Sequence, residues 1–350
     1  MTVKLGVLGF AHGHIMSYGN EWLNHPELGI QFTKGWDWNS ATKKNCCEKL
    51  KMEAAESVEE VLQSCDAVVI SSETAFHTKL VELAANAKKD IICYKPMALS
   101  LLEADKIVEA VERNGVRFTM AYQMRSDPQN IKIKELVDTG AIGDIYQYRR
   151  RHSLSTHLWG NFEDTWHNDK AMNRDIFADD SSHPIDMLNW IFGVPETVSC
   201  ELTTMSNPKV KNDGGAALFK YKNGMLATIS CNFASCTTEP TTEVYGSNGT
   251  ILQYYGDGVS CHNLTRSGPG LKWHINGDKD WTVSDIDSPS GHGWRIANQY
   301  IGLGEFLRGE RGPLCSVYEG RDSLRMVLAC YLSNNEGRRV RIDDPAIYNI

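Results

Sequence analysis

The chain has 350 residues, a length that suggests two domains rather than one. Its 41% hydrophobic and 23% charged residues are ordinary for a globular protein and supply enough apolar material for two cores. The net charge of -8 argues against nucleic acid as the main partner, because phosphate binding needs a basic surface. The short basic run Arg149-Arg150-Arg151 is interpreted as an exposed strand end.

The sequence also argues against a membrane or secreted protein. No window holds eighteen unbroken apolar residues, so we expect no membrane-spanning helix. The first residues enter a strand directly, without the basic and apolar regions of a signal peptide. The ten cysteines include no Cys-x-x-Cys pair and are scattered through apparent strands and helices, which indicates reduced, mostly buried thiols. We therefore expect a cytoplasmic location and no membrane partner.

Strands and helices alternate over the first part of the chain, which predicts a doubly wound parallel sheet. Capping boxes at Ser57-Val58-Glu59-Glu60 and Ser100-Leu101-Leu102-Glu103 mark the starts of two of the helices. The expected strands are Val3–Gly9, Ile30–Gly35, Asp66–Ser71, Asp90–Cys93 and Val116–Tyr122.

The turn after the first strand has the chemistry of a dinucleotide-binding loop. Gly9 permits a tight turn, and the following helix presents its N-terminus to a pyrophosphate. Asp37, after the second strand, can accept hydrogen bonds from ribose hydroxyls, and its charge would repel a 2′-phosphate. NAD is therefore favoured over NADP. The G-x-G-x-x-G fingerprint is imperfect, because Ala11 and His14 replace its second and third glycines.

A lysine follows the strand Asp90–Cys93 almost directly, in the run Tyr94-Lys95-Pro96. Ligands of open α/β sheets bind at the carboxyl ends of the strands. A lysine at such a position is costly to bury unless it has a function. Lys95 is therefore the first candidate catalytic residue.

The pattern changes after residue 123. A helix starting at Asp127-Pro128 is followed by a series of strands, which predicts an α+β domain with a largely antiparallel open sheet. The glycine-rich stretch Tyr255–His292 is expected to be loop, and helices are expected at Trp294–Leu307 and Glu319–Asn335. The expected strands are Ile145–His152, Val198–Thr204, Ala216–Tyr221, Met225–Asn232, Thr241–Gly246 and Thr250–Tyr254.

The segment Asp179–Trp190 combines three acids with one imidazole. His183 and Asp186 share one face of a predicted helix, and Asp179 and Asp180 stand just before that helix. Such a cluster suits proton transfer. A second interpretation stays open, in which the acids cap the helix and the histidine is satisfied by a neighbour.

Together these features resemble the glucose–fructose oxidoreductase / inositol dehydrogenase / rhizopine catabolism family, Gfo/Idh/MocA, over nearly the whole chain. The dinucleotide fold, Tyr94-Lys95-Pro96 for the family's Glu-Lys-Pro, and Asp179–Asp186 for its Asp-x-Gly-x-His-x-x-Asp carry the resemblance. It implies a Rossmann-like NAD(P)-binding domain over residues 1–123. It also implies a substrate-binding and oligomerisation domain over residues 124–350, with a homodimer or homotetramer formed through the C-terminal sheet.

The resemblance further implies roles for individual residues. Lys95 would stand beside the nicotinamide and the reacting hydroxyl, His183 would be the general acid/base, and Asp179 would orient it or bind substrate. The implied cofactor contacts are Gly9, Ala11, His12, Asp37, Ser71, Ser72, His77, Tyr94, Lys95, Pro96 and Gln123. The implied substrate contacts are Lys95, Arg125, Trp166, His167, Asp179, Asp180 and His183.

Three positions depart from the family pattern. Tyr94 stands at the usual glutamate, and a phenol hydrogen-bonds but carries no charge near neutral pH. Ser181 replaces a glycine, and Asp180 adds an acid. No metal is expected, because the histidine pair His12-x-His14 lies in the phosphate loop with no acidic partner spaced to close a site.

The expected function is that of an NAD-dependent dehydrogenase, which transfers a hydride between a secondary alcohol of a sugar, sugar derivative or cyclitol and nicotinamide. Two alternatives stay open. One is a redox-cycling glycosidase or lyase, which would give product without net NADH. The other is a non-catalytic sugar or nucleotide sensor, against which the presence of Lys95 and His183 speaks.

Overall fold

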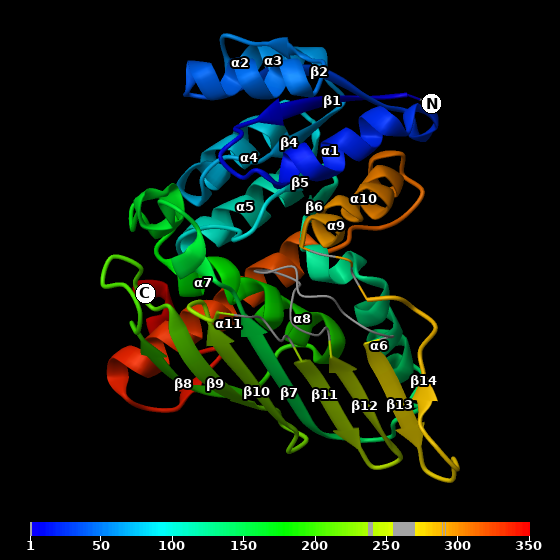
Figure 1. The fold of residues 1–350 in the computed structure, drawn as a ribbon. Helices are drawn as coiled ribbons and strands as arrows, with labels where there is room; N and C mark the ends of the chain where they lie inside the picture. Colours follow the sequence, from blue (N-terminus) through cyan, green and yellow to red (C-terminus); the bar gives the residue numbers. More distant parts are fainter. Residues whose placement is uncertain (1, 237–240, 255–269, 289, 291) are drawn as a thin grey trace. The chain divides into compact units, whose positions relative to one another are not determined.

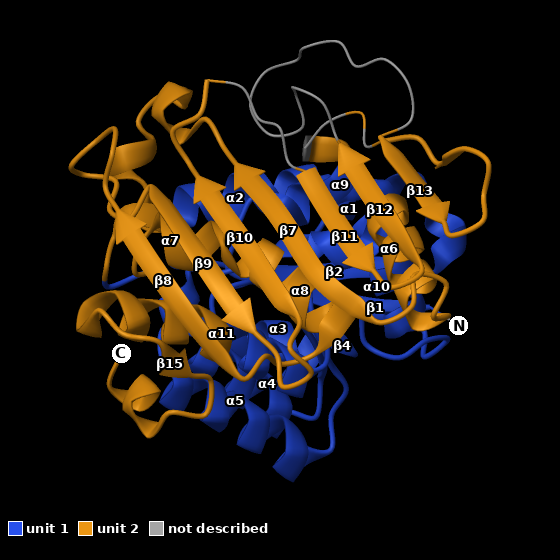
Figure 2. Ribbon diagram, turned by 90° about the horizontal axis from the view of Figure 1, so that it is seen from below, with its two compact units in different colours: residues 1–126, 171–173, 295–324 blue, residues 127–170, 174–294, 325–350 orange. Residues whose placement is uncertain are grey.

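The computed structural model describes residues 2–236, 241–254, 270–288, 290 and 292–350 (Figure 1). These residues form two compact units that the chain enters more than once. Unit 1 comprises residues 1–126, 171–173 and 295–324, and unit 2 comprises residues 127–170, 174–294 and 325–350 (Figure 2). Two stretches that follow residue 123 in the chain therefore pack in unit 1.

Unit 1 contains a six-stranded parallel sheet in the order β3-β2-β1-β4-β5-β6. The strand order reverses between β1 and β4, which is the switch point where doubly wound folds bind ligands. The predicted doubly wound parallel sheet is confirmed. The strands are β1 Val3–Leu8, β2 Ile30–Trp36, β3 Glu53–Ala54, β4 Ala67–Ile70, β5 Asp90–Cys93 and β6 Phe118–Met120.

Local sequence signals explain where several helices of this unit begin and end. The predicted capping box of Ser100 and Glu103 is present in both directions, and Gly115 ends the same helix in a left-handed conformation with φ of 62°. Ser57 accepts a hydrogen bond from the backbone N–H of Glu60. The helices are α1 His14–Asn24, α2 Ser40–Lys49, α3 Val58–Ser64, α4 His77–Asn86, α5 Leu101–Asn114 and α10 Gln299–Leu307.

The last segment of unit 1, residues 295–324, is attached to the rest of that unit by specific hydrogen bonds. The indole of Trp22 in α1 donates to the carbonyl of Tyr300 in α10 over 2.8 Å. Arg117 donates to the carbonyl of Phe306 over 2.6 Å. The single helix expected over Trp294–Leu307 is instead α9 His292–Ala297 and α10, separated at Asn298, whose side-chain amide donates to the Ser126 carbonyl over 2.8 Å.

Unit 2 contains a nine-stranded sheet in the order β14-β13-β12-β11-β7-β10-β9-β8-β15. Every pairing in it is antiparallel except that of β7 with β10, so the predicted largely antiparallel sheet is confirmed. The strands are β7 Ile145–Ser153, β8 Thr197–Thr203, β9 Gly214–Lys220, β10 Leu226–Asn232, β11 Thr241–Gly246, β12 Gly249–Tyr254, β13 Leu271–Ile275, β14 Thr282–Val283 and β15 Val340–Arg341.

The expectation that Tyr255–His292 is loop is wrong for β13 and β14. Leu271–Ile275 pairs with β12, which supplies the hydrogen bonds that a glycine count does not anticipate. The rest of the prediction at residues 255–269, 289 and 291 lies outside the described residues.

The helices of unit 2 cover one face of its sheet, and the other face carries no helix in the described part of the unit (Figure 2). The covering helices are α6 Pro128–Asp138, α7 Ile176–Asp180, α8 Ser182–Phe192 and α11 Val317–Glu336, and the last of these begins within unit 1. Short 3-10 turns lie at Pro26–Leu28, Thr74–Phe76, Gln123–Ser126, Thr156–Leu158, Phe162–Asp164, Trp166–Asn168 and Pro345–Asn349. In the described part of the chain, every helix is too short or too polar to cross a bilayer.

Candidate active site

The loop after β1 is shaped for a dinucleotide. Gly9 has φ of +83°, and a Cβ there would lie 2.5 Å from the Cα of Ser72, so this position requires glycine. Ser71 braces the same loop, because its hydroxyl donates to the His12 carbonyl over 2.7 Å and its own carbonyl accepts from the His12 N–H over 2.9 Å. The loop after β1 therefore lies close to the loop after β4 and leads directly into the N-terminus of α1. The N–H groups of a helix N-terminus favour an anion, so this arrangement fits a pyrophosphate.

Asp37 lies at the end of β2 and is fixed by two backbone amides. Its Oδ2 accepts from the N–H of Phe10 over 2.7 Å, and its Oδ1 accepts from the N–H of Asn39 over 2.7 Å. Each carboxylate oxygen keeps a further lone pair for a ribose hydroxyl. A second acid, Glu73, was missed in the sequence. Burial raises the pKa of Glu73, and the charge of Asp37 raises it further, so the two carboxyl groups influence each other directly.

An aromatic group accompanies these acids. The rings of Trp38 and Phe76 lie 4.2 Å apart, and those of Trp36 and Trp38 lie 4.5 Å apart. Trp38 follows Asp37 in the chain and Phe76 follows Glu73 by one turn, so the ring contact brings their two loops together. Trp38 stays 46% exposed, which suits a flat apolar ring such as adenine.

Lys95 is buried, with 3% of its surface exposed, directly beyond the carboxyl end of β5. The peptide between Lys95 and Pro96 is cis. His77 connects this turn to the loop after β4, since its Nδ1 lies 2.9 Å from the Pro96 carbonyl and its Nε2 lies 3.2 Å from the Ser72 carbonyl. Burial lowers the pKa of His77 to about 4, so the neutral ring donates to one carbonyl at a time.

Tyr94 points into the core of unit 1 and is fully buried. Its ring stacks on that of His12 at 4.5 Å and on that of Tyr18 at 6.0 Å. Burial raises the pKa of Tyr94 well above its ordinary value, so the phenol is neutral where the family usually has a carboxylate. Tyr94 thus packs against His12 of the phosphate loop from the core of unit 1. Its direct contact with the cofactor stays a prediction.

The remaining predicted residues of unit 1 lie after β6. Gln123 and Arg125 are buried in the turn Gln123–Ser126. The guanidinium of Arg125 donates to Glu319 over 2.6 Å and to the Leu314 carbonyl over 2.9 Å. Arg125 therefore connects the turn after β6 to residues 295–324 of the same unit. Its contact with substrate stays a prediction.

Unit 2 brings together a second group of predicted residues. Asp179 and Asp180 end α7, and the helical conformation of Ser181 (φ −65°, ψ −18°) carries the chain directly into α8. His183 therefore follows the two acids on one nearly continuous helical surface. All three residues are more than nine-tenths buried.

Each acid of this cluster pairs with a different histidine. Nδ1 of His167 lies 2.8 Å from Oδ2 of Asp179, and Nε2 of His152 lies 2.7 Å from Oδ2 of Asp180. Trp166 stacks on His167 with ring centroids 3.9 Å apart. The cluster thus holds three imidazoles rather than the single one predicted for the helix segment, which gives it more capacity for proton transfer.

His152 is the residue that sequence reasoning missed. It lies on β7 two positions after Arg150, and the burial of that strand alternates so that both side chains point inward. The interpretation of the basic run as an exposed strand end is therefore wrong for Arg150, which is 2% exposed and donates to Thr242 over 2.5 Å. Strict alternation along β7 was the signal that could have identified both residues.

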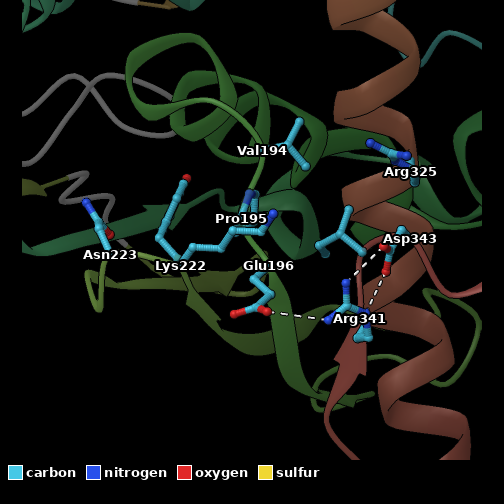
Figure 3. A pocket seen from close by; sticks show the side chains of 10 residues that line it. Val194, Pro195, Glu196, Lys222, Asn223, Arg325, Arg341 and Asp343 are labelled. Carbon is cyan, nitrogen blue, oxygen red and sulfur yellow. Dashed lines mark hydrogen bonds and ion pairs between the residues drawn. The ribbon is translucent and has the colours of Figure 1, made fainter.

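A cavity of about 480 Å³ in unit 2 shares no residue with this cluster (Figure 3). Arg341 on its wall pairs with Asp343 over 2.8 Å and with Glu196 over 3.4 Å. Its described wall carries carboxylates but no histidine, so it lacks the imidazoles that the cluster offers. Elsewhere too, the described residues include no set of three His, Cys, Asp or Glu side chains arranged to hold a metal ion.

Comparison with known proteins places these features in a family. Residues 3–122 match the model described as oxidoreductase family, NAD-binding Rossmann fold. Residues 130–252 match the model of the GFO/IDH/MocA C-terminal domain. The two models together cover most of the chain, including Lys95, His152 and His183.

Two curated relatives and one solved structure illustrate the likeness. Oxidoreductase P35 of Formosa agariphila is 30% identical over 192 residues, which are 53% of this chain and 58% of the relative. D-apiose dehydrogenase of Paraburkholderia graminis is 26% identical over 291 residues, which are 80% of this chain and 74% of the relative. The chain thus spans little more than half the length of the first relative and about three quarters of the second.

The solved structure is a levoglucosan dehydrogenase in complex with NADH and levoglucosan. It superposes with a TM-score of 0.83 over 98% of this chain and 100% of its own, at 17% identity. At 17% identity this structural similarity establishes the fold alone. Membership of a family is established by the two family models, which match the sequence. The chain belongs to the Gfo/Idh/MocA family of NAD-binding oxidoreductases.

Proposed function

We propose that this protein is an NAD-dependent dehydrogenase that oxidises a secondary alcohol of a sugar, sugar derivative or cyclitol. The observation that carries the proposal is the buried Lys95 at the carboxyl end of β5, in a unit whose phosphate loop requires Gly9. The names of the relatives, among them a D-apiose dehydrogenase, favour a polyhydroxylated substrate. In this proposal residues 1–123 bind NAD and residues 124–350 bind substrate.

NAD, when bound, accepts a hydride from the carbinol carbon. The phosphate loop with Gly9, Ala11 and His12 would hold its pyrophosphate, and Asp37 would hold the adenosine ribose. The remaining proposed contacts along the cofactor are Ser71, Ser72, His77, Tyr94, Lys95, Pro96 and Gln123.

The substrate hydroxyl must lose its proton as the carbon loses its hydride. In the proposed mechanism His183 accepts this proton and Lys95 stabilises the negative charge that develops on the oxygen. The products are a ketone, NADH and an imidazolium that releases its proton to water. Asp179, which holds His167 at 2.8 Å, would stabilise the charged His183 or bind a neighbouring hydroxyl. Arg125, Trp166, His167 and Asp180 complete the proposed substrate contacts.

The proposal includes a cytoplasmic location and a homodimer or homotetramer. The cysteines of the described residues are free, and all except Cys236 are buried, as in a reducing compartment. The uncovered face of the unit 2 sheet carries the exposed side chains of Leu218, Leu226 and Tyr254, which a second copy would shield from water.

A substrate screen tests the proposal. Sugars, glycosides and cyclitols are incubated with NAD or NADP while NADH absorbance and product chromatography are followed together. We expect at least one substrate to give a ketone and NADH in equal amounts. Product without net NADH would instead indicate the redox-cycling glycosidase or lyase, and the absence of any turnover with binding retained would indicate a sensor.

The two acids near the ribose predict the choice of cofactor. Their charges would repel the 2′-phosphate of NADPH, so NADH should bind the wild-type protein more tightly. Asp37→Asn/Glu73→Gln keeps the size of both side chains and should tighten NADPH binding by about tenfold for each charge removed. NADH binding should weaken, because an amide holds the ribose hydroxyls less strongly than the Asp37 carboxylate. Fluorescence titration of the reduced cofactors measures this without turnover. A wild-type preference for NADPH would contradict the prediction.

A further inference from the structure

Residues 171–173, called the anchor segment below, pack in unit 1 although the chain on both sides of them does not. Residues 127–170 before them and residues 174–294 after them belong to unit 2. The proposed substrate contacts Trp166 and His167 precede the anchor segment by only a few residues. The chain that carries these two side chains is therefore attached to the unit that contains the proposed cofactor loops.

Two hydrogen bonds hold the anchor segment to the turn after β4. The Thr74 hydroxyl donates to Oδ1 of Asn173 over 2.5 Å, and the N–H of Ala75 donates to the Met172 carbonyl over 3.0 Å. Thr74 and Asn173 are each only 1% exposed, so the bond between their side chains lies in a low-dielectric interior where it is stronger than in water. A side-chain bond and a backbone bond thus join the segment to adjacent residues of one 3-10 turn.

The same turn borders the proposed cofactor site. A Cβ on Gly9 of the phosphate loop would lie 2.5 Å from the Cα of Ser72, two residues before Thr74. The ring of Phe76, at the other end of the turn, lies 4.2 Å from that of Trp38, which follows Asp37 in the chain. A cofactor that contacts the phosphate loop and the acid after β2 would therefore hold this turn from both ends.

The chain leaves the anchor segment through a strained residue. Arg174 has φ of +76°, a backbone region that residues with a side chain rarely adopt. Its guanidinium lies 5.1 Å from the centre of the Tyr331 ring and donates to the Ile350 carbonyl over 2.9 Å. The next residue, Asp175, caps α7 by accepting from the N–H of Ala178 over 3.0 Å. Such a conformation persists only where the structure on both sides holds it, so the bonds of the anchor segment have a strained backbone to maintain.

The stretch before the anchor segment has little regular structure of its own. It contains the 3-10 turns Thr156–Leu158, Phe162–Asp164 and Trp166–Asn168, which are closed by backbone bonds between residues three apart. Segments with mainly local bonds open at a low cost in free energy. The order of this stretch therefore depends on its attachments, which include the bond of His167 to Asp179 over 2.8 Å and the anchor segment.

We propose that Thr74 is a positioning residue, and that NAD bound beside its turn orders the chain of Trp166 and His167 through the bond to Asn173. A cofactor that holds the turn removes conformational freedom from the anchor segment, so less freedom remains to be lost when the attached chain becomes ordered. The inference rests on the proposed function and extends it, because the order of two proposed substrate contacts then depends on the cofactor.

Hydrogen–deuterium exchange of the full-length protein with and without NADH tests the inference without a substrate. In the wild type, NADH should slow the exchange of residues 71–77 and, by about fivefold, that of residues 162–173. Thr74→Val keeps the shape of the side chain but loses the donor, so the protection should be confined to residues 71–77. Asn173→Ala removes the acceptor instead and should give the same result. Thr74→Ser keeps the hydroxyl and should retain both protections.

The matched control is Thr33→Val, which removes another hydroxyl of unit 1, one that donates to the Leu5 carbonyl over 3.2 Å. It should leave both protections as in the wild type. The inference is overturned if Thr74→Val and Asn173→Ala still protect residues 162–173, or if NADH protects residues 71–77 alone in the wild type. If NADH protected neither stretch in the wild type, the proposed function would fail together with the inference.

Discussion

Lys95→Met is expected to lower kcat by about 10³-fold while the affinity for NADH stays close to that of the wild type. Methionine keeps most of the apolar stem in a site where Lys95 is only 3% exposed, so the variant removes the charge with little change in packing. The loss should fall on kcat more than on KM, because the ammonium stabilises a charge that exists only as the alkoxide forms. Steady-state kinetics and NADH fluorescence titration measure the two quantities separately.

The matched control is Lys79→Ala, which removes an exposed lysine from α4 of the same unit. Its kinetics should equal those of the wild type. If Lys95→Met retained kcat within about tenfold, charge stabilisation by this residue would be excluded. If it instead lost NADH binding, Lys95 would be a cofactor anchor rather than a catalytic residue.

The Rossmann-like unit could be predicted strand by strand because its signals are local. Buried parallel strands appear as short apolar runs, and caps such as Ser100 with Glu103 mark helix starts. The short edge strand β3 was not predicted, since two residues carry no periodicity. β13 was missed for a related reason: its five residues form a strand because β12 offers a partner, and glycines around them suggested loop.

The sequence did not predict that residues 171–173 and 295–324 return to unit 1. The helix Gln299–Leu307 has apolar residues that any core would accept, and nothing in its sequence identifies α1 as its partner. That partner is recognised only through bonds such as Trp22 to the Tyr300 carbonyl, across 278 residues. Contacts of this kind are set by tertiary packing, so a linear division of the chain cannot anticipate them.

The candidate site shows the same division between local and distant information. The places of Lys95 after a strand and of His183 at a helix start could be predicted from local signals, and their roles stay a prediction. The partners of the two acids could not be predicted, because His152 lies 28 residues from Asp180 on a strand of the sheet. Sequence spacing connected Asp179 to His183, and the structure adds a bond from Asp179 to His167.

The second large effect is expected for His183→Gln. Glutamine has a similar reach but cannot accept a proton near neutral pH, so kcat should fall by about 10²- to 10⁴-fold. The acidic limb of kcat/KM should disappear with it, since that limb reports the protonation of the base. His274→Gln, on β13 of the same unit, is the control and should leave both the rate and the pH profile unchanged. A variant that keeps the limb would show that another group is the base.

Combining the two changes tests whether Lys95 and His183 act on one hydroxyl. If both groups act on the same oxygen in one transition state, removing the second costs little once the first is gone. Lys95→Met/His183→Gln should therefore lose far less in kcat than the product of the two single losses, as residues that act as a unit are non-additive. If the losses multiplied instead, the two residues would stabilise separate steps. Lys95 would then belong to cofactor or substrate binding, and the proton would leave the hydroxyl without help from its charge.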